Sequence, residues 1–598
     1  MEFMKPIASA SLPIGSDWLY EIKYDGFRCM ILIDEDSCRL ISKNGKDLTA
    51  NFPEIAAACK SLKVKGSTVL DGELVVLNHK YGANFSLIQK RGRLRNAEKI
   101  EITQQERPAS FIAFDILKAD GKTCEKEPCA QRRKKLVAWF NKTKPSEHIQ
   151  LIEQTNNAEE IQQIAFDNKA EGIIAKKARS NYIGGKGHRD WLKVKNWRTV
   201  HCFLTKWNRD NDYFSAAVHG GSTGIREIGK VKHGLDDDSF RALKQAFTTH
   251  GKEIGNEMML PPAICAAVNT LDLYEGEIRE ANFAQIIQGG TPSEMTEKMM
   301  KRDLAMLPEQ LDLSNPEKIF WPQQGYTKED LVTYIRNISP YMLPFLKRKA
   351  LTLIRYPDGV EGEFFFQKHL PPYVPESFSY MLNEEGEKRI LFDELFPLVW
   401  FANHGAIEYH MPFEKAGKST PIEIVFDLDP PNREHFHLAV KAALLIKELT
   451  DGLGLTAFVK TSGSKGLQIH IPIREGSLTY DETAICTQAI ALTVERAQPD
   501  LFTTERLKKK RSGRLYLDYV QHASGKTIIA PYSPRHVPEA AVATPLFWDE
   551  VDESLRIEQF TLDNVLARVE QYGCPFANYE KAGAEQDLEK LRRLIGAE

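Results

Sequence analysis

The sequence predicts a multidomain α/β protein with an additional small β domain. The chain has 598 residues, more than a single hydrophobic core usually organises. It is 42% hydrophobic and 27% charged, as is typical of globular proteins. Apolar strands that carry charged residues occur in the first third and in the second half, and short β-like runs lie between them. We expect domains at 1–198, 199–288 and 311–598, with a linker at 289–310.

Charge and cysteine usage narrow the functional classes. The net charge is only −3, so any nucleic-acid binding must use local basic patches. No apolar run is long enough to span a bilayer, and the N-terminus lacks the apolar region of a signal peptide. The nine cysteines are scattered without zinc-site spacing, which indicates reduced thiols. We therefore expect a cytoplasmic protein without a membrane partner.

The first strand pair of the 1–198 domain carries a candidate nucleophile. Lys23 lies between two apolar, β-prone runs, and Gly26 permits a sharp turn there. To attack phosphorus, this lysine must lose its proton, so its pKa must fall from roughly 10.4 through desolvation or nearby cations. Arg28 is a candidate for such a cation and for a phosphate ligand. An ordinary exposed hairpin turn is the alternative interpretation.

Further strands follow in order along this domain. They are 69–76, interrupted by Asp71-Gly72-Glu73, then 111–117 with Phe114, then 171–176 beginning at Glu171, and 191–195. In the last strand, Lys193 and Lys195 are two residues apart, so both amines project from one face. Two convergent lysines with nearby carboxylates suit a nucleoside triphosphate and a metal ion.

This series resembles the motifs of the covalent nucleotidyltransferases, which include ATP-dependent DNA ligases, RNA ligases and mRNA capping enzymes. The resemblance implies an ATP-grasp-like nucleotidyltransferase domain that uses ATP. It implies these roles: adenylated nucleophile, Lys23; adenine recognition, Glu21; ribose and metal, Glu73 and Glu171; base stacking, Phe114; α-phosphate, Lys193 and Lys195; motif I arginine, Arg28.

The next segment, 199–288, predicts a small barrel from its short β-like runs. The ligases place an OB-fold barrel here, with basic residues that orient the pyrophosphate. Arg279 is the one basic residue that resembles this motif, and its usual downstream partner is missing. Residues 289–310 are polar and Met-rich, which indicates a linker with a helical piece.

The second half carries a different set of acidic residues. A buried strand at 424–429 ends with Asp427 and Asp429 on one face, and Asp518 lies in a later strand. Carboxylates at this spacing can bridge two divalent cations in a phosphoryl displacement. The turn at 461–466 exposes backbone amides, and together with Lys465 it suits a triphosphate. The basic run 508–511 alone indicates a solvated loop.

These features resemble the archaeo-eukaryotic primase-type polymerase of bacterial DNA ligase D. The resemblance covers nearly all of 311–598 and implies a primase-like α/β domain. It implies these roles: 5′-phosphate and template contacts, Asn315, Lys318, Lys328, Arg355 and Phe366; nucleotide contacts, Ser462, Lys465, Gln521 and Arg535; a place near the active site, His410. Gln468 stands where the family has histidine, and His470 faces the same side, so either could contact the triphosphate.

Together the two halves resemble bacterial DNA ligase D without its phosphoesterase domain. This implies repair of double-strand breaks with Ku at DNA ends, nicks and gaps that carry a 5′-phosphate. It implies ATP for sealing, NTP or dNTP substrates with ribonucleotides favoured, and Mg²⁺ or Mn²⁺. Three alternatives remain: an RNA-repair or capping enzyme, a non-catalytic end-binding scaffold, and a primase-ligase without a repair role.

Overall fold

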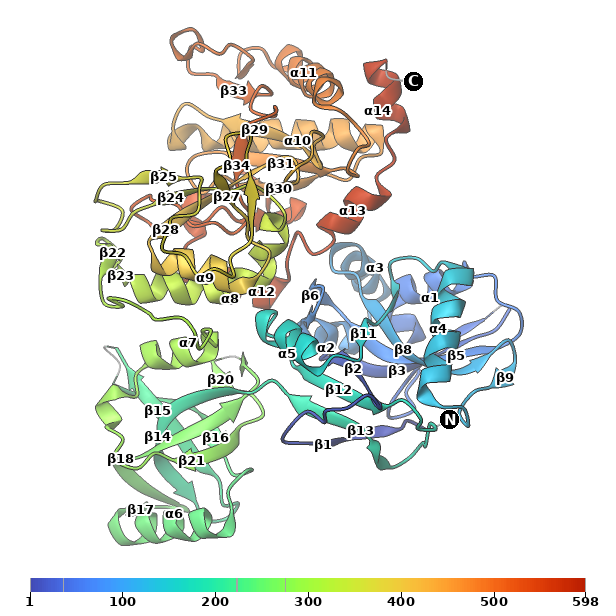
Figure 1. Ribbon diagram of the computed structural model, residues 1–598, viewed down its shortest axis with the longest axis vertical. Helices are drawn as coiled ribbons and strands as arrows, with labels where there is room; N and C mark the ends of the chain where they lie inside the picture. Colours follow the sequence, from blue (N-terminus) through green and yellow to red (C-terminus); the bar gives the residue numbers. More distant parts are fainter. Residues whose placement is uncertain (1, 36, 222–223, 275, 597–598) are drawn as a thin grey trace. The chain divides into compact units, whose positions relative to one another are not determined.

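The computed structural model describes residues 2–35, 37–221, 224–274 and 276–596 (Figure 1). The chain divides into two compact units, Met1–Leu307 and Pro308–Glu598. Each unit has its own sheets and helices, and we describe each unit by itself.

The first 195 residues form two large sheets and a two-stranded hairpin, β6 (Leu77–His79) and β7 (Gly82–Ala83). The strands of the first sheet, in spatial order, are β1 (Lys5–Ala8), β13 (Gly187–Lys195), β12 (Gly172–Lys177), β2 (Trp18–Lys23) and β11 (Gln154–Thr155). Those of the second are β10 (Ile149–Leu151), β8 (Ser110–Ala119), β5 (Thr68–Val75), β3 (Phe27–Ile33) and β4 (Cys38–Ser42), with β9 (Lys122–Thr123) paired to β8. The helices are α1 (Pro53–Lys60), α2 (Phe85–Arg93), α3 (Ala97–Glu106), α4 (Cys129–Thr143) and α5 (Ala158–Asp167). Helix α5 packs on β2 and β12, and α4 packs on β8.

Strand β5 corrects one expectation. The acidic residues at its centre do not interrupt it, because it continues through Asp71, Gly72 and Glu73 to Val75. The pairing with β8 shifts between Asp71 and Gly72 instead. A Cβ at Gly72 would lie 2.6 Å from the carbonyl oxygen of Ile112, so the two strands approach too closely there for a side chain.

Residues 198–286 form an antiparallel curled sheet. Its strands, in order, are β16 (Gly224–Val231), β15 (Phe214–Gly220), β14 (Arg198–Asn208), β18 (Glu257–Thr270) and β17 (Lys252–Ile254), with β21 (Asn282–Ile286) also paired to β18 and α6 (Asp237–His250) packed on it. Within the described residues this pairing path is open, so hydrogen bonds do not close the expected barrel into a ring. A short hairpin, β19 (Leu273–Tyr274) and β20 (Glu277–Ile278), precedes β21.

The segment expected to be a linker is packed instead. Helix α7 (Glu297–Ala305) lies against β14 and β15, and its Met300 and Leu304 are buried in the core of the curled sheet. Thr296 caps the helix by accepting a hydrogen bond from the backbone of Met299. The compact first unit therefore extends to Leu307.

The second unit is built on two larger sheets. One has the order β32 (Phe502–Thr503), β33 (Leu515–Asp518), β29 (Glu423–Asp429), β31 (Leu467–Pro472), β30 (Phe458–Thr461) and β35 (Pro545–Leu546). The other has the order β25 (Phe365–Gln367), β24 (Thr352–Arg355), β28 (Ala406–Pro412) and β34 (Thr527–Ile529). The main helices are α8 (Lys328–Leu346), α9 (Leu395–Asn403), α10 (Phe436–Leu453), α11 (Tyr480–Ala497), α12 (Val565–Tyr572), α13 (Tyr579–Glu585) and α14 (Glu589–Ile595). Helices α10 and α11 both contact β29.

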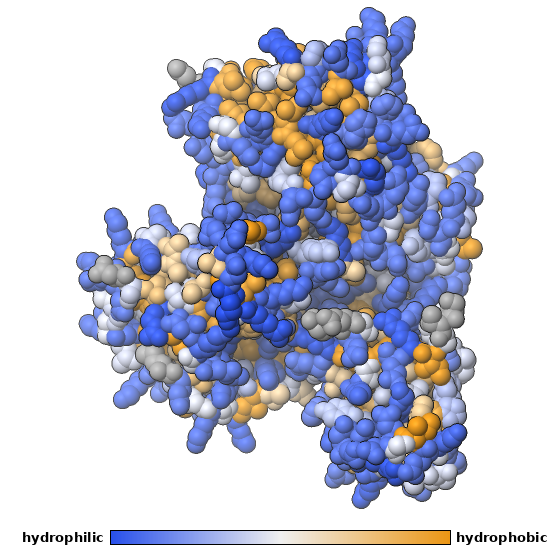
Figure 2. Space-filling view, turned by 180° about the vertical axis from the view of Figure 1, so that it is seen from behind, coloured by the Kyte–Doolittle hydropathy of each residue, from blue (hydrophilic) through white to orange (hydrophobic). Residues whose placement is uncertain are grey.

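The surface and the thiols agree with the composition. Figure 2 shows a mostly hydrophilic face, with hydrophobic residues gathered over the second unit. Among the described residues, no helix combines the length and the apolar character that crossing a membrane requires. All nine cysteines are buried free thiols.

Candidate active sites

Lys23 stands at the end of β2, where three strands bring charged residues together. In the register of the sheet, Gly172 of β12 lies opposite Lys23 on one side and Lys195 on the other. A Cβ at Gly172 would lie 2.3 Å from the carbonyl oxygen of Val194, so the close spacing of β12 and β13 requires glycine. Glu171, which precedes this glycine, is thereby placed beside Lys23.

Lys23 is paired with a carboxylate. Its Nζ donates to Oε1 of Glu171 at 2.5 Å, and Glu73 lies close enough to interact electrostatically. Burial lowers the pKa of Lys23, but Glu171, Glu73 and Asp25 outweigh it, and the pKa is raised. We expected a pKa lowered by desolvation or by Arg28, and this structure shows the opposite direction. Burial also raises the pKa of Glu73 to about 8 and that of Glu171 above its ordinary value.

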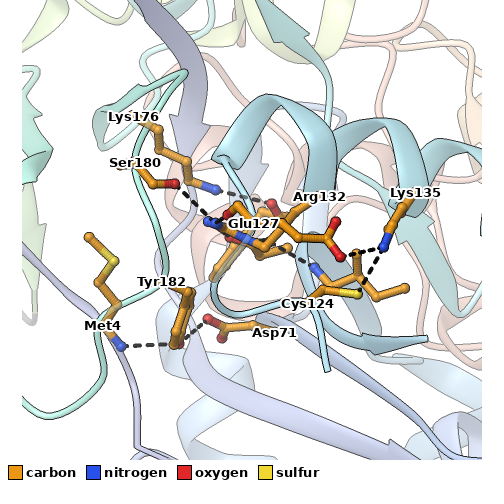
Figure 3. A network of polar contacts seen from close by, with 12 residues as sticks. Met4, Asp71, Cys124, Glu127, Arg132, Lys135, Lys176, Ser180 and Tyr182 are labelled. Atoms are coloured by element: carbon orange, nitrogen blue, oxygen red, sulfur yellow. Dashed lines mark hydrogen bonds and ion pairs between the residues drawn. The ribbon is translucent and has the colours of Figure 1, made fainter. Parts of the chain in front are cut away.

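Arg28 forms an ion pair with Asp71, not with the carboxylates around Lys23. Its Nε and Nη2 donate to the two oxygens of buried Asp71 at 2.8 and 2.6 Å, a bidentate pair. Tyr182 also donates to Asp71, at 2.7 Å, and accepts a hydrogen bond from the backbone of Met4 (Figure 3). The guanidinium lies 4.5 Å from the centre of the Phe114 ring. This network holds Arg28 against the aromatic residue that we expected to stack on a base.

Glu21 faces a polar environment that the sequence did not reveal. It is buried, pairs with Lys176 at 2.7 Å and accepts from Gln154 at 2.6 Å. Lys176 lies 4.5 Å from the ring centre of Phe114 and 4.4 Å from that of Trp191. Lys176 and Gln154 are thus candidates for the nucleotide pocket. Lys176 is the last residue of the 171–176 run that begins at Glu171, and Gln154 stood in no recognised motif.

Lys193 and Lys195, the two expected α-phosphate lysines, lie at the end of β13 near Lys23. Lys23, Lys195 and burial lower the pKa of Lys193, with burial the largest cause, so Lys193 lies near the nucleophile. Lys195 pairs with Glu280, and Arg279 pairs with Asp25 beside Lys23. Arg279 also lies 4.8 Å from the ring centre of Phe85. Arg279, the expected pyrophosphate-orienting residue, therefore reaches the loop that follows the nucleophile.

In the second unit, the three expected aspartates approach one another. Asp427 and Asp518 face each other across β29 and β33. Burial, Asp429 and Asp518 raise the pKa of Asp427 to about 6 against the hydrogen bond from Gln468, with burial the largest cause. Asp429 pairs with Lys465 at 2.8 Å and Arg511 at 3.7 Å. In the described chain, no group of three or more His, Cys, Asp or Glu side chains is arranged to hold a metal ion.

The turn after β30 is stabilised by its own serine. Oγ of Ser462 accepts hydrogen bonds from the backbone amides of Ser464, Lys465 and Gly466 at 3.0–3.3 Å. Gly463 has a φ of +67°, which favours glycine. Arg433, which sequence reasoning did not single out, donates from Nε to the carbonyl of Ser464 at 2.9 Å and from Nη1 to Glu539 at 2.9 Å. The turn is therefore held from outside as well as from within.

The two candidates for the histidine position differ. Nε2 of Gln468 donates to Oδ1 of Asp427 at 3.1 Å, which places Gln468 at the acidic cluster. His470 is wholly buried and pairs with Glu423 at 2.8 Å, in a cluster with Lys349 and Tyr579. The suggestion that His470 contacts a triphosphate is therefore wrong in this structure, because its side chain lies in the core.

Two more nucleotide candidates and a buried lysine complete this site. The backbone amide of Gln521 donates to Asp518 at 2.9 Å, and its side chain donates to the carbonyl of Thr527. Arg535 lies 3.3 Å from Glu408. Lys460, directly across from Gln468, is fully buried, and burial, opposed by Asp427, lowers its pKa to about 7. Its position in an apolar strand run gave no functional signal.

The candidate 5′-phosphate residues gather at the start of the second unit. Nζ of the buried Lys328 donates to Ser314 at 2.8 Å, and burial together with Lys318 lowers its pKa. Lys318 pairs with Asp358, and Asn315 has a φ of +46°. Arg355 donates to Gln367 at 3.0 Å and to Tyr373 at 3.1 Å. Phe366 is 63% exposed, available for stacking rather than for the core.

Comparisons with known proteins agree on both units. A family model described as an ATP dependent DNA ligase domain matches residues 2–195, and one described as the primase-polymerase domain of LigD matches 327–576. The bifunctional non-homologous end joining protein LigD of Bacillus subtilis is 37% identical, over 98% of each chain. The multifunctional LigD of Pseudomonas aeruginosa is 25% identical over 98% of this chain and 73% of its own. A solved polymerase domain of Mycobacterium tuberculosis Ligase D, in complex with DNA, is 29% identical with a TM-score of 0.43 and covers 47% of this chain and all of its own.

Proposed function

This chain belongs to the LigD family of bifunctional non-homologous end joining proteins, and we propose that its two sites seal and fill broken DNA. It combines an ATP-dependent DNA ligase domain with a LigD primase-polymerase domain that follows it. The observation that carries the proposal is the relative that matches over 98% of both chains, because that match includes both domains in the same order. No observation favours an RNA capping enzyme.

The finer proposal concerns substrates and partners. We infer that the chain acts on double-stranded DNA ends, nicks and gaps that carry a 5′-phosphate, together with Ku. Lys318 and the buried Lys328 support this, because two adjacent cations in one place suit a phosphate. We also propose that the polymerase unit, a primase-like fold, favours ribonucleotides, and that residues 199–288 act as an OB-fold that closes on DNA.

For sealing, Lys23 is the proposed nucleophile towards the α-phosphate of ATP. The Nζ–P bond forms as the bond to pyrophosphate breaks, and the lysine must first lose its proton. Glu171 already accepts the hydrogen bond from Nζ, and burial raises the pKa of this carboxyl, so it is placed to take that proton. Lys193 and Lys195 would bind the phosphates, while Glu21 and Phe114 would bind the base.

For filling, the DNA 3′-hydroxyl attacks the α-phosphate of the incoming nucleotide, and pyrophosphate leaves. Asp427, Asp429 and Asp518 would hold Mg²⁺ or Mn²⁺, which would stabilise the charge that develops on the phosphate oxygens. The donor types fit, because carboxylate oxygens are hard ligands and a cation would offset the burial and the repulsion from Asp429 and Asp518 that raise the pKa of Asp427. In the described residues the three side chains are not already arranged as a metal site. Glu73 and Glu171 are the corresponding candidates in the ligase unit. Ser462, Lys465, Gln468, Gln521 and Arg535 would bind the nucleotide.

The test separates the two chemistries. The full chain and Lys23→Ala are incubated with α-labelled ATP and then with a nicked duplex, and nucleotide addition is measured in parallel. We expect Lys23→Ala to acquire no label and seal no nick, while its nucleotide addition equals that of the unaltered protein. Label on the Lys23→Ala protein would contradict the assignment of the nucleophile.

A further inference from the structure

Glu408 is a buried carboxylate of the second unit that contacts one arginine and two histidines. It lies in β28, between β24 and β34, and is 1% exposed. Oε2 lies 3.0 Å from Nε2 of His410. Oε1 contacts Nδ1 of His536, accepts from the backbone amide of His536 at 3.2 Å and lies 3.3 Å from Nε of Arg535. One side chain thus joins Arg535 of the proposed nucleotide site to His410, which the resemblance places near the active site.

The charge of Glu408 persists inside the protein. Burial alone would raise its pKa, but the hydrogen bonds from His410 and His536 and the charge of Arg535 hold the pKa well below its usual range. A buried carboxylate is tolerated only when such partners compensate for its lost hydration. Burial of the charged Glu408 therefore costs hydration free energy, and the three partners must all be present to offset that cost.

Arg535 connects this group to the turn that precedes β31. A Cβ built on Gly463 would lie 2.7 Å from Cγ of Arg535, so the arginine stem packs directly on the backbone of the turn. The backbone amide of Arg535 is fixed as well, because it donates to the carbonyl of Ala541 at 2.8 Å. Nε of Arg535 is buried and forms an ion pair with Glu408 without a hydrogen bond. We therefore expect the direction of the long side chain to depend on this ion pair.

We propose that Glu408 is a positioning residue for the incoming nucleotide, which holds Arg535 and His410 in the orientation that receives the triphosphate. This rests on the proposed nucleotide site and extends it to a residue that would not touch the substrate. Arg535 carries a guanidinium and His410 can donate a hydrogen bond, so both side chains suit an anionic ligand once they are held in place. Pre-ordering of a long arginine lowers the entropic cost of binding that ligand.

The test uses the full chain on gapped DNA, with Glu408→Gln and a matched control, Glu423→Gln. Both variants neutralise a buried glutamate of the same unit, but Glu423 pairs with Lys349, His470 and Tyr579 in the core. We expect Glu408→Gln to raise KM for the nucleotide about tenfold with kcat changed less than about threefold, as for loss of one charge-assisted contact. We expect Glu423→Gln to leave KM unchanged at a temperature where both variants are folded.

Arg535→Lys makes the possible failures distinguishable, because it keeps the charge and loses the guanidinium that Glu408 meets. Unchanged KM in Arg535→Lys would overturn the proposed nucleotide site. Raised KM in Arg535→Lys with unchanged KM in Glu408→Gln would overturn the role of Glu408, and so would an equal rise in Glu423→Gln. If Glu408→Gln does not fold, Glu408→Asp replaces it. Glu408→Asp keeps the charge, but its shorter side chain cannot contact both Arg535 and His410. An unchanged KM in this variant would also overturn the proposal.

Discussion

Asp427 meets two other aspartates, and its substitution tests whether they act as a metal site. Asp427→Asn keeps the shape of the side chain and its contact with Gln468 but removes one charge. We expect nucleotide addition to fall by at least about 100-fold, the size of effect seen when one charge-stabilising group leaves an active site. Sealing of a ready nick should persist, because Lys23 lies in the other unit. Asp451→Asn, at an exposed position of α10, is the control, and extension near the unaltered rate in Asp427→Asn would refute the assignment.

Lys318 tests the proposed 5′-phosphate contact. Its partner in this structure is Asp358, and the buried Lys328 lies near it. We expect Lys318→Ala to weaken filling of gaps that carry a 5′-phosphate by about 10-fold or more, since charge-assisted hydrogen bonds contribute roughly 1.5–3 kcal/mol. On a plain primer-template the variant should behave normally. Lys441→Ala removes an exposed lysine of the same unit as a control, and equal losses on phosphorylated and unphosphorylated gaps would count against the contact.

At the residue scale, a functional residue can be recognised from the sequence when it stands in a short motif. Lys23, Asp427 and Ser462 have neighbours that carry the same chemistry, so spacing alone singles them out. Gln154, Arg433 and Glu408 act through partners that are far away in sequence: Gln154 meets Glu21, Arg433 meets Glu539, and Glu408 meets Arg535. Such residues become visible only when the sheets bring the distant segments together.

Strand β12 brings the ligase residues together. Its first residue, Gly172, has no space for a side chain larger than hydrogen. A Cβ at Gly172 would meet the backbone of Val194 at 2.3 Å, and backbone cannot rotate away as a side chain can. We expect Gly172→Ala to push β12 and β13 apart, destabilise the unit by about 1–3 kcal/mol and slow self-adenylation. Gly187→Ala is the matched control in β13, because its Cβ would meet the nearest atom at an ordinary 3.4 Å. Thermal unfolding and labelling by ATP measure both effects, and equal behaviour of the two variants would contradict the argument.

Elements differ in how well the sequence predicts them. Apolar runs predicted the β2, β8, β13 and β29 strands, because short apolar runs bounded by turn residues are typical of buried strands. The pattern failed at β5, where Asp71-Gly72-Glu73 resembles a turn in sequence. These residues stay in the strand because the pairing with β8 shifts its register between Asp71 and Gly72. At 289–310 the sequence predicted a helical piece, which is α7, but not its packing, since polar residues on one face of α7 concealed the buried Met300 and Leu304 on the other.

At the scale of the whole molecule, the division of the chain falls near the end of the polar segment 289–310 and not at its start. The contacts of α7 belong to the first unit, which ends at Leu307, and the second unit begins at Pro308. Each unit contains all of its own proposed catalytic residues, from Lys23 to Lys195 in one and from Asn315 to Arg535 in the other. The two chemistries should therefore be separable by cutting the chain at this point.

We expect residues 1–307 to acquire label from ATP and seal nicks when expressed alone, and residues 308–598 to add nucleotides. A matched fragment that ends at residue 288 lacks α7, which removes Met300 and Leu304 from the core of the curled sheet. Loss of two buried side chains of this size costs about 2–5 kcal/mol each, comparable to the stability of a small domain. Fragment 1–288 should therefore unfold at a markedly lower temperature than 1–307 and expose hydrophobic surface. Equal melting temperatures for the two fragments would show that α7 is a linker after all, and the cut would then belong near residue 288.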